Sequence, residues 1–314
     1  MDLSVVISAY SLDRYDDLTS VLNGLKKQTY KYFETIVVID ENKELINKIN
    51  EYIEANGIKN TTLIFNPKNR GLSYSRNVGI KNTSGSIVAF IDDDATPADD
   101  WVKNIIDTFL ENESIGAVTG DVVPLWENES MAWFPKELYW MISCSYVMTP
   151  TMKTEVERGF GTNMAFRRAI FDKIGCFDTY LGINGKKWIG GEDTAMFLKI
   201  KSANFKVIFN PKIRVQHKIY LSRLNPRNIA KRSFNGGYSV ALMKKGIKYK
   251  LQGSTENEYL KYIFFTSSQK YLINFIKSPS KIVFYQMISI CVVLFFESSG
   301  YFFGSLQNNL LKLG

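Results

Sequence analysis

The first 120 residues alternate short apolar runs with segments of helical periodicity. Five runs rich in β-branched residues have the length of strands buried on both faces: Val5–Ile7, Thr35–Ile39, Thr62–Phe65, Ile87–Ile91 and Gly116–Thr119. Helical spacing covers Asp16–Gln28, Lys43–Asn56, Ser73–Lys81 and Pro97–Glu111. This alternation predicts a doubly wound α/β domain, in which ligands bind at the carboxyl ends of the strands.

A different pattern begins near residue 280. Residues 282–304 are almost continuously apolar and long enough to cross about 30 Å of hydrocarbon. Glu297 interrupts this run, so a membrane span, a re-entrant insertion, an interfacial helix and a soluble core helix all stay open. Upstream, residues 259–276 mix apolar and basic side chains, as in a helix lying on lipid headgroups. Lysines are more frequent before the apolar run than after it, which predicts that residues 1–280 lie in the cytoplasm.

Charge is distributed unevenly along the 314 residues. Residues 1–198 contain 20 basic and 28 acidic side chains, whereas residues 199–314 contain 19 basic and 3 acidic ones. The second half therefore faces an anionic partner, either nucleic acid or a membrane surface. The apolar run favours anionic membrane lipids, and no nucleic-acid-binding motif accompanies the charge. We therefore expect a catalytic domain over 1–220, a basic amphipathic helical region over 221–280 and a transmembrane or re-entrant segment over 281–305.

The absence of several well-known motifs disfavours some classes of function. No G-x-G-x-x-G follows the first strand and no G-x-x-x-x-G-K-[ST] occurs, which disfavours dinucleotide-binding oxidoreductases and P-loop NTPases. The three cysteines are scattered, which excludes a disulfide scaffold and a cysteine zinc site.

Three adjacent carboxylates follow the fourth predicted strand. Asp92, Asp93 and Asp94 could cap a helix, but Thr96 and Pro97 already supply a helix start. Carboxylates this close raise one another's pKa, and a divalent cation relieves the repulsion. Hard oxygen ligands suit Mg²⁺ or Mn²⁺, which commonly bridge to a diphosphate. The triplet therefore predicts a metal site.

Other polar residues follow neighbouring strands. Ser8 and Tyr10 follow the first strand, and Asp40 after the second would hydrogen-bond a ribose or base, although Asp also begins turns. Residues 69–77 combine a turn glycine with Arg70 and Arg76. Arg76 could reach a diphosphate or base; a surface arginine is the alternative.

Two further signals lie after residue 180. Glu192 and Asp193 follow two glycines at the predicted start of a helix over 194–202. A helix N-terminus favours an ionised carboxylate, which can serve as a general base, although a simple capping pair would look the same. The chain's single histidine, His217, ends a later strand. A packing role is common for such a residue, but it could also complete a metal shell begun by the aspartates.

In their order along the chain, these motifs resemble those of family 2 glycosyltransferases of the GT-A fold. The resemblance covers about residues 3–217 and includes Gly161-Thr162-Asn163 as well as the strand-end groups above. It implies a Rossmann-like mixed sheet and an inverting, metal-dependent hexosyltransferase that uses a UDP-sugar with Mg²⁺ or Mn²⁺. The usual Pro-Thr-Tyr-Asn opening is Ser-Ala-Tyr-Ser here, and no Q-x-x-R-W follows Glu192-Asp193, which disfavours a processive polymer synthase.

The resemblance also implies roles for individual residues. Asp193, with Glu192 beside it, is expected to act as the catalytic base, and Asp94 and His217 as metal ligands. The remaining candidates are expected to bind the nucleotide-sugar or surround the sugar and acceptor: Ser8, Tyr10, Asp40, Arg70, Arg76, Asp92, Asp93, Gly161, Thr162 and Asn163.

More narrowly, the early aspartate triplet, the Gly-Thr-Asn loop and the basic tail resemble archaeal transferases that extend lipid-linked N-glycans. In that group a uronic-acid-type sugar is added to a glycosyl dolichyl phosphate. The resemblance therefore implies a dolichyl-phosphate-linked acceptor at the cell membrane. One alternative is a synthase that acts on bare polyprenyl phosphate. The other is a non-enzymatic membrane adaptor with a degenerate transferase domain.

Overall fold

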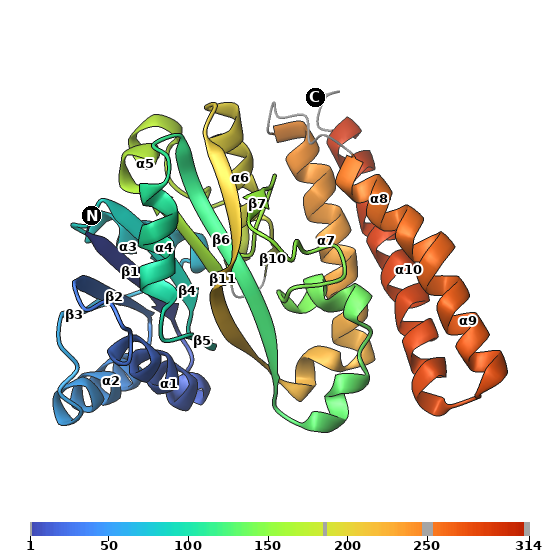
Figure 1. The fold of residues 1–314 in the computed structure, drawn as a ribbon, viewed down its shortest axis with the longest axis horizontal. Helices are drawn as coiled ribbons and strands as arrows, with labels where there is room; N and C mark the ends of the chain where they lie inside the picture. The colour runs from blue at the N-terminus through green and yellow to red at the C-terminus, as the bar shows by residue number, and fades with distance from the viewer. Residues whose placement is uncertain (1, 185–186, 247–253, 311–314) are drawn as a thin grey trace. The chain divides into compact units, whose positions relative to one another are not determined.

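The computed structural model describes residues 2–184, 187–246 and 254–310, and the chain forms two compact units (Figure 1). The first unit comprises residues 1–124, 150–188 and 192–218. The second comprises residues 125–149, 189–191 and 219–314. The expected catalytic domain over 1–220 thus contains a segment, residues 125–149, that is grouped with the C-terminal helices.

The first unit is built on a nine-stranded mixed sheet. Its parallel half has the order β3 (Thr61–Asn66), β2 (Phe33–Asp40), β1 (Leu3–Ala9) and β4 (Ile87–Asp92). The order continues with β8 (Asn163–Arg167), β6 (Ile115–Trp126), β11 (Lys206–Ile219) and β5 (Ala95–Pro97), while β7 (Thr154–Glu155) pairs with β11. Because β8 runs antiparallel to β4 and β6, the sheet is mixed. The predicted mixed α/β architecture is confirmed.

Six helices belong to this unit, among the residues that the structure describes. They are α1 (Tyr15–Lys26), α2 (Lys43–Ala55), α3 (Leu72–Lys81), α4 (Trp101–Leu110), α5 (Arg168–Ile174) and α6 (Glu192–Ser202). A 3₁₀ turn, η1 (Leu12–Arg14), precedes α1, and β9 (Gly182–Asn184) pairs with β10 (Lys187–Ile189). Each of the first three helices follows a parallel strand, so the strand ends that precede them open at one edge of the sheet.

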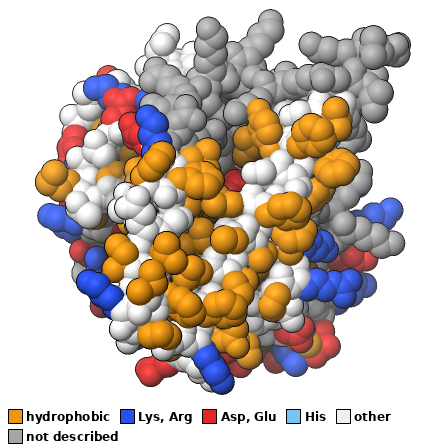
Figure 2. All heavy atoms as spheres, turned by 90° about the vertical axis from the view of Figure 1, so that its right-hand side faces the viewer, with side chains coloured by type: hydrophobic (Ala, Val, Ile, Leu, Met, Phe, Trp, Pro, Cys, Tyr) orange, Lys and Arg blue, Asp and Glu red, His pale blue; other side chains and the backbone are white. Residues whose placement is uncertain are grey.

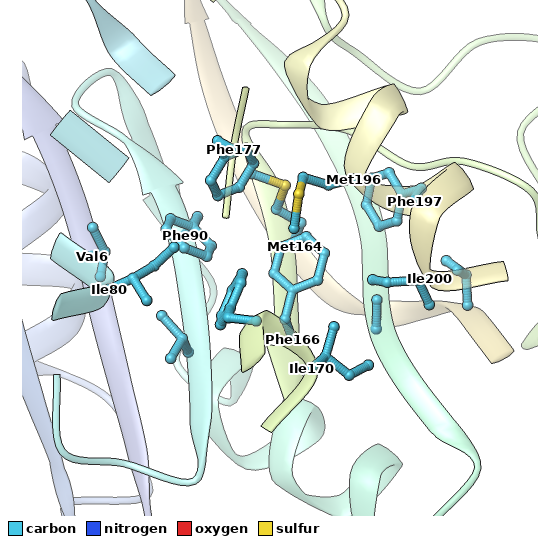
Figure 3. Packing of buried hydrophobic residues seen from close by; sticks show 14 of the residues in the cluster. Val6, Ile80, Phe90, Met164, Phe166, Ile170, Phe177, Met196, Phe197 and Ile200 are labelled. Carbon is cyan, nitrogen blue, oxygen red and sulfur yellow. The ribbon is translucent and has the colours of Figure 1, made fainter. Parts of the chain in front are cut away.

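An aromatic core holds the strands that carry the site (Figure 3). Phe90 of β4 meets Phe177 edge to face, with ring centroids 5.2 Å apart, and Phe166 of β8 packs beside both. Helix α3 lies directly on β1, since a Cβ added to Gly79 would come 2.3 Å from a methyl carbon of Val6. This packing fixes β1, β4 and α3 relative to one another, and each of them ends in or carries a candidate site residue.

The prediction that a helix begins at Pro97 is wrong. Ala95–Pro97 form β5, which pairs antiparallel with β11 from Val215 to His217, and α4 begins only at Trp101. Strand β11 supplies the pairing that holds these residues extended, and Pro97 fits because an edge strand needs no N–H donor there. The short strand matters for the site because it aligns His217 with Ala95, directly after the aspartates.

The second unit is helical. It contains η2 (Glu129–Trp133), η3 (Lys136–Ile142), η4 (Leu221–Leu224), α7 (Pro226–Gly246), α8 (Ser254–Tyr262), the π-helical turn η5 (Ile263–Ser267), α9 (Ser268–Lys277) and α10 (Lys281–Leu310). Helix α10 packs against α7 and α9 (Figure 1). Over residues 281–306, α10 is long and apolar enough to cross a membrane, which indicates membrane association.

Candidate active site

The metal-ligand candidates lie where β4 and β11 bring their polar residues together. Asp92 ends β4, Asp94 lies in the following turn, and His217 is near the end of β11. One ligand atom from each of the three lies within 4.8 Å of the others, and His217 Nε2 is 3.2 Å from an Asp94 carboxylate oxygen. Asp94 and His217 are almost completely buried. Two carboxylates and an imidazole therefore converge on one point.

The middle aspartate of the triplet turns to a different partner. Asp93 is buried and accepts a hydrogen bond of 2.6 Å from Arg14, whose guanidinium also lies 3.3 Å from Asp94. Burial raises the pKa of Asp93 to about 7; the Arg14 charge opposes this shift and the neighbouring Asp94 adds to it. The second Asp93 oxygen is buried and has no hydrogen-bond partner among the described residues. Arg14 is a site residue that the sequence analysis did not predict.

Arg76 connects three parts of the site. Its buried guanidinium donates hydrogen bonds to Asp92 at 3.1 Å, to Glu192 at 3.0 Å and to the Gly161 carbonyl at 3.1 Å. The face of this guanidinium lies 5.5 Å from the centre of the Phe177 ring. Arg76 was expected to contact the nucleotide. In the structure it holds the end of β4, the loop before β8 and the start of α6 in one arrangement.

The two acidic residues at the start of α6 have different surroundings. Glu192 is buried against Arg76, and burial raises its pKa to about 7; the nearby Asp193 charge adds to the shift and Arg76 opposes it. Asp193 is only partly buried. Of this pair, Asp193 has the accessible carboxylate that a base requires, and Glu192 holds Arg76.

Backbone donors orient the Asp193 carboxylate. Its Oδ2 accepts from the Gly161 N–H at 2.9 Å, and its Oδ1 accepts from the Thr194 N–H at 2.7 Å. A Cβ on Gly161 would lie 2.9 Å from Oδ2, which explains a glycine at this position. Beside it, the Thr162 hydroxyl donates to Asp92 at 2.7 Å. The loop therefore links the predicted base to Asp92 at the end of β4.

Asn163, the third residue of that loop, has a structural role instead. Its side chain is fully buried, accepts from the Trp101 indole N–H at 2.9 Å and donates to the carbonyls of Asp121 and Ile213. These bonds join α4, β6 and β11. Because its amide already has partners on both atoms and no exposed surface, Asn163 does not line the site as expected.

The remaining candidates lie around the ends of β1 and β2. Asp40 is buried, accepts from Ser75 at 2.7 Å and from Asn66 at 2.6 Å, and has a pKa raised by burial. The Ser8 hydroxyl is buried without a hydrogen-bond partner among the described residues, whereas Tyr10 is exposed.

Arg70 is exposed, and its guanidinium stacks on the ring of Tyr74 at 4.9 Å. It therefore lies apart from the network that Arg76 organises.

The charges of this site favour a cation. Five carboxylates gather here, those of Asp92, Asp93, Asp94, Glu192 and Asp193. The guanidinium of Arg14 contacts Asp93 and Asp94, and that of Arg76 contacts Asp92 and Glu192. The excess of negative charge, together with the converging carboxylate and imidazole ligand atoms, fits a divalent cation bound between Asp92, Asp94 and His217.

Comparison with known proteins agrees with this geometry. Residues 4–175 match the family described as glycosyl transferase family 2. The chain is 33% identical, over 99% of its own length and 99% of the relative, to the glucosyl-dolichyl phosphate glucuronosyltransferase of Haloferax volcanii. It is 29% identical over 53% of its length to the succinoglycan biosynthesis protein ExoM of Rhizobium meliloti, covering 50% of that protein.

Solved structures share the fold. The mannosyltransferase PcManGT of Pyrobaculum calidifontis, in complex with GDP-Man and Mn²⁺, superposes with a TM-score of 0.61 at 16% identity. The match covers 98% of this chain and 86% of that one. GalNAc-T7 with UDP, GalNAc and Mn²⁺ gives a TM-score of 0.56 at 18% identity, over 87% of this chain and 57% of that one. The chain belongs to glycosyltransferase family 2, with the GT-A fold, and is a glycosyltransferase.

Proposed function

We propose that this protein moves a sugar from a UDP-sugar to a glycosyl dolichyl phosphate, with inversion at the anomeric carbon, in the assembly of N-linked or cell-surface glycans. The observation that carries the proposal is the full-length similarity to the Haloferax volcanii glucuronosyltransferase, whose name specifies a glucosyl-dolichyl phosphate acceptor. Because that relative is named as a glucuronosyltransferase, we also propose that the donor carries a uronic-acid-type sugar.

The reaction is a single displacement. An acceptor hydroxyl oxygen forms a bond to the anomeric carbon while the bond from that carbon to the diphosphate oxygen breaks. Asp193 accepts the hydroxyl proton late in this step, when the attacking oxygen has become acidic. Two backbone N–H groups hold its carboxylate in place, so the base needs no rearrangement to act.

Asp92, Asp94 and His217 would hold the divalent cation, which supplies charge neutralisation for the departing diphosphate. The imidazole favours Mn²⁺ over Mg²⁺, because Mg²⁺ prefers an all-oxygen shell. The presence of Mn²⁺ in both solved structures that share the fold is in keeping with this choice. Arg76 and Glu192 act as positioning residues, since they hold Asp92, Gly161 and the start of α6 together.

A lipid-linked acceptor requires the protein to work at a membrane. The apolar helix α10 and the basic excess of residues 199–314 support binding to anionic lipids. We propose that the catalytic unit lies on the cytoplasmic side of the cell membrane, because lysines are more frequent before the apolar run than after it.

A substrate panel tests the proposal. Purified protein is incubated with Mn²⁺, one of several radiolabelled UDP-sugars, and either glucosyl dolichyl phosphate or bare dolichyl phosphate, and lipid-extracted label is counted. Transfer to the glycosylated lipid, lost on chelation with EDTA, is the expected result. Transfer only to bare lipid would identify a polyprenyl-phosphate sugar synthase. If no donor and acceptor pair gave metal-dependent UDP release, the proposed UDP-sugar donor and lipid-linked acceptor would be refuted.

A further inference from the structure

Helix α10 is packed against protein along one side. At its centre, α7 approaches so closely that a Cβ on Gly237 would lie 1.9 Å from the Glu297 carbonyl oxygen. A Cβ on Gly300 would lie 1.9 Å from the Phe234 carbonyl oxygen. Nearer its start, the Gln286 side chain donates to the carbonyl of Trp133 in η2. Helix α10 therefore cannot be surrounded by lipid without bringing α7 and η2 with it.

Helix α7 is too polar for that environment. It carries Arg227, Lys231 and Arg232 in its first half and Lys244 and Lys245 near its end. Arg232 and Lys244 are 12 positions apart, which corresponds to about 18 Å of helix, against about 30 Å of hydrocarbon in a bilayer. A spanning α10 would place charges of α7 in the hydrocarbon, at a large cost.

The opposite sides of α9 and α10 are apolar and exposed. On α10, Phe284, Ile288, Phe295, Phe302 and Leu306 follow one another at helical spacing and are 43–66% exposed. The π-helical turn η5 and helix α9 add a second row of exposed apolar side chains: Phe264, Phe265, Leu272, Ile273 and Ile276. We call these ten side chains the apolar face. Figure 2 shows hydrophobic side chains gathered on this side of the molecule, with basic side chains toward its edges.

The charges beside the apolar face identify its partner. Residues 259–306 contain four lysines, at positions 261, 270, 277 and 281, and a single acidic residue, Glu297. Residues 277–281 form the tip of the α9–α10 hairpin and are polar and exposed. Insertion into the membrane with this tip leading is therefore disfavoured, because these polar residues would enter the hydrocarbon. A second copy of this chain would bring lysines against lysines, whereas anionic headgroups complement them.

From these contacts we infer that α9 and α10 bind one leaflet of an anionic membrane in the plane of the surface. Phenylalanine, isoleucine and leucine side chains of the apolar face enter the boundary between headgroups and acyl chains, and the lysines contact lipid phosphates. The other side of α10 stays on α7. Of the arrangements that the sequence leaves open, the packing of α10 thus selects the interfacial helix.

Depth measurements on the full-length protein test this arrangement. Nitroxide labels are placed on single cysteines at 288, 295 and 302, in a chain whose own cysteines are replaced by alanine, and bound to phosphatidylglycerol-containing vesicles. An in-plane helix places all three labels at similar depth, about 5–10 Å below the headgroups. A helix along the membrane normal would spread them over about 20 Å, with the deepest label in the middle of the helix, and would overturn the inference.

A binding measurement supplies a second test. Phe295→Asp with Phe302→Asp should lower partitioning into these vesicles by on the order of a hundredfold, while Tyr32→Asp, an exposed aromatic of the first unit, should leave it unchanged. Unchanged thermal unfolding would show that the double variant folds. Undiminished partitioning of a folded double variant, or a concentration-dependent dimer with no vesicle binding, would refute the inference. Neither test uses donor or acceptor, so its result is independent of the proposed activity.

Discussion

The first unit buries charged side chains, whereas the second leaves large apolar side chains exposed. Arg76, Asp94 and Glu192 have little contact with solvent, and each is kept in place by an oppositely charged or hydrogen-bonding neighbour. In the second unit, Phe295 and Phe302 are 66% and 60% exposed. Both arrangements are unfavourable in water for an isolated chain. The partners proposed above compensate for this: a divalent cation would neutralise carboxylates of the first unit, and a lipid surface would cover the apolar face of the second.

Asp193→Asn is expected to give the largest difference between an effect on the first unit, measured as turnover, and an effect on the second, measured as vesicle binding. Asparagine keeps an acceptor oxygen for one of the two backbone N–H groups but cannot take a proton, so turnover should fall by about 10³-fold or more. Nucleotide binding, measured by calorimetry, and vesicle binding should not change. Asp172→Asn, at an exposed position on α5, is the matched control. Turnover near the wild-type value in Asp193→Asn would remove this residue from the base role.

Removal of the imidazole should weaken the metal site. His217→Ala should raise the Mn²⁺ concentration needed for half-maximal activity by tens of fold, in line with the loss of one ligand. Direct Mn²⁺ binding, followed by electron paramagnetic resonance, should shift by a similar factor. Gln216→Ala alters the exposed neighbour on the same strand and should leave both curves in place. An unaltered Mn²⁺ titration in His217→Ala would leave the histidine with a packing role.

The buried charge of Glu192 should appear in the pH dependence of stability. Because its pKa is raised from 4.5 to about 7, the folded protein holds a proton that the unfolded chain has already released between these values. The free energy of unfolding of the wild type should therefore fall, relative to Glu192→Gln, by roughly 1–3 kcal/mol as the pH rises through this window.

Above about pH 8 that difference should be constant, because both folded and unfolded Glu192 are then ionised. Denaturant titrations at several pH values measure this difference in the free energy of unfolding. Glu113→Gln, which changes an exposed glutamate, is the control. A difference that grew in the opposite direction would mean that the Arg76 charge outweighs burial.

A smaller effect is expected from the buried carboxylate of the second unit. Glu137 accepts from the Ser267 hydroxyl at 2.6 Å and from the Tyr271 hydroxyl at 2.9 Å, which joins η3 to the start of α9. Glu137→Ala should destabilise the protein by about 1–3 kcal/mol, because two buried hydroxyls lose their acceptor. Vesicle binding should weaken while Mn²⁺ binding is unaffected.

Glu129→Ala, at an exposed position, is the control for that comparison. Equal loss of Mn²⁺ binding and vesicle binding in Glu137→Ala would indicate that the two units do not behave separately.

Much of this organisation is visible in the sequence. Strands β1 to β4 follow from short apolar runs, and the polar residues after them follow from the direction of parallel strands. The aspartate triplet and His217 were expected to share a site, and ligand atoms of Asp92, Asp94 and His217 do converge. The apolar character of residues 282–304, in α10, also follows from composition. The strand and helix properties depend on residues close together in the chain or on one repeated period. The link between Asp94 and His217, which are 123 positions apart, was implied by the family resemblance.

Other properties depend on contacts between distant segments. Arg14 lies 79 residues before Asp93, and no local pattern marks its guanidinium as the partner of the triplet. Asn163 belongs to a family motif, yet packing of α4 and β11 gives it a structural role.

Pairing with β11 converts the expected helix start at Pro97 into a strand. Close approach of α7 to α10 determines which side of an apolar helix is left for lipid. Periodicity specifies the elements, but only packing decides which side of each element is covered, because that choice depends on atoms far away in the sequence.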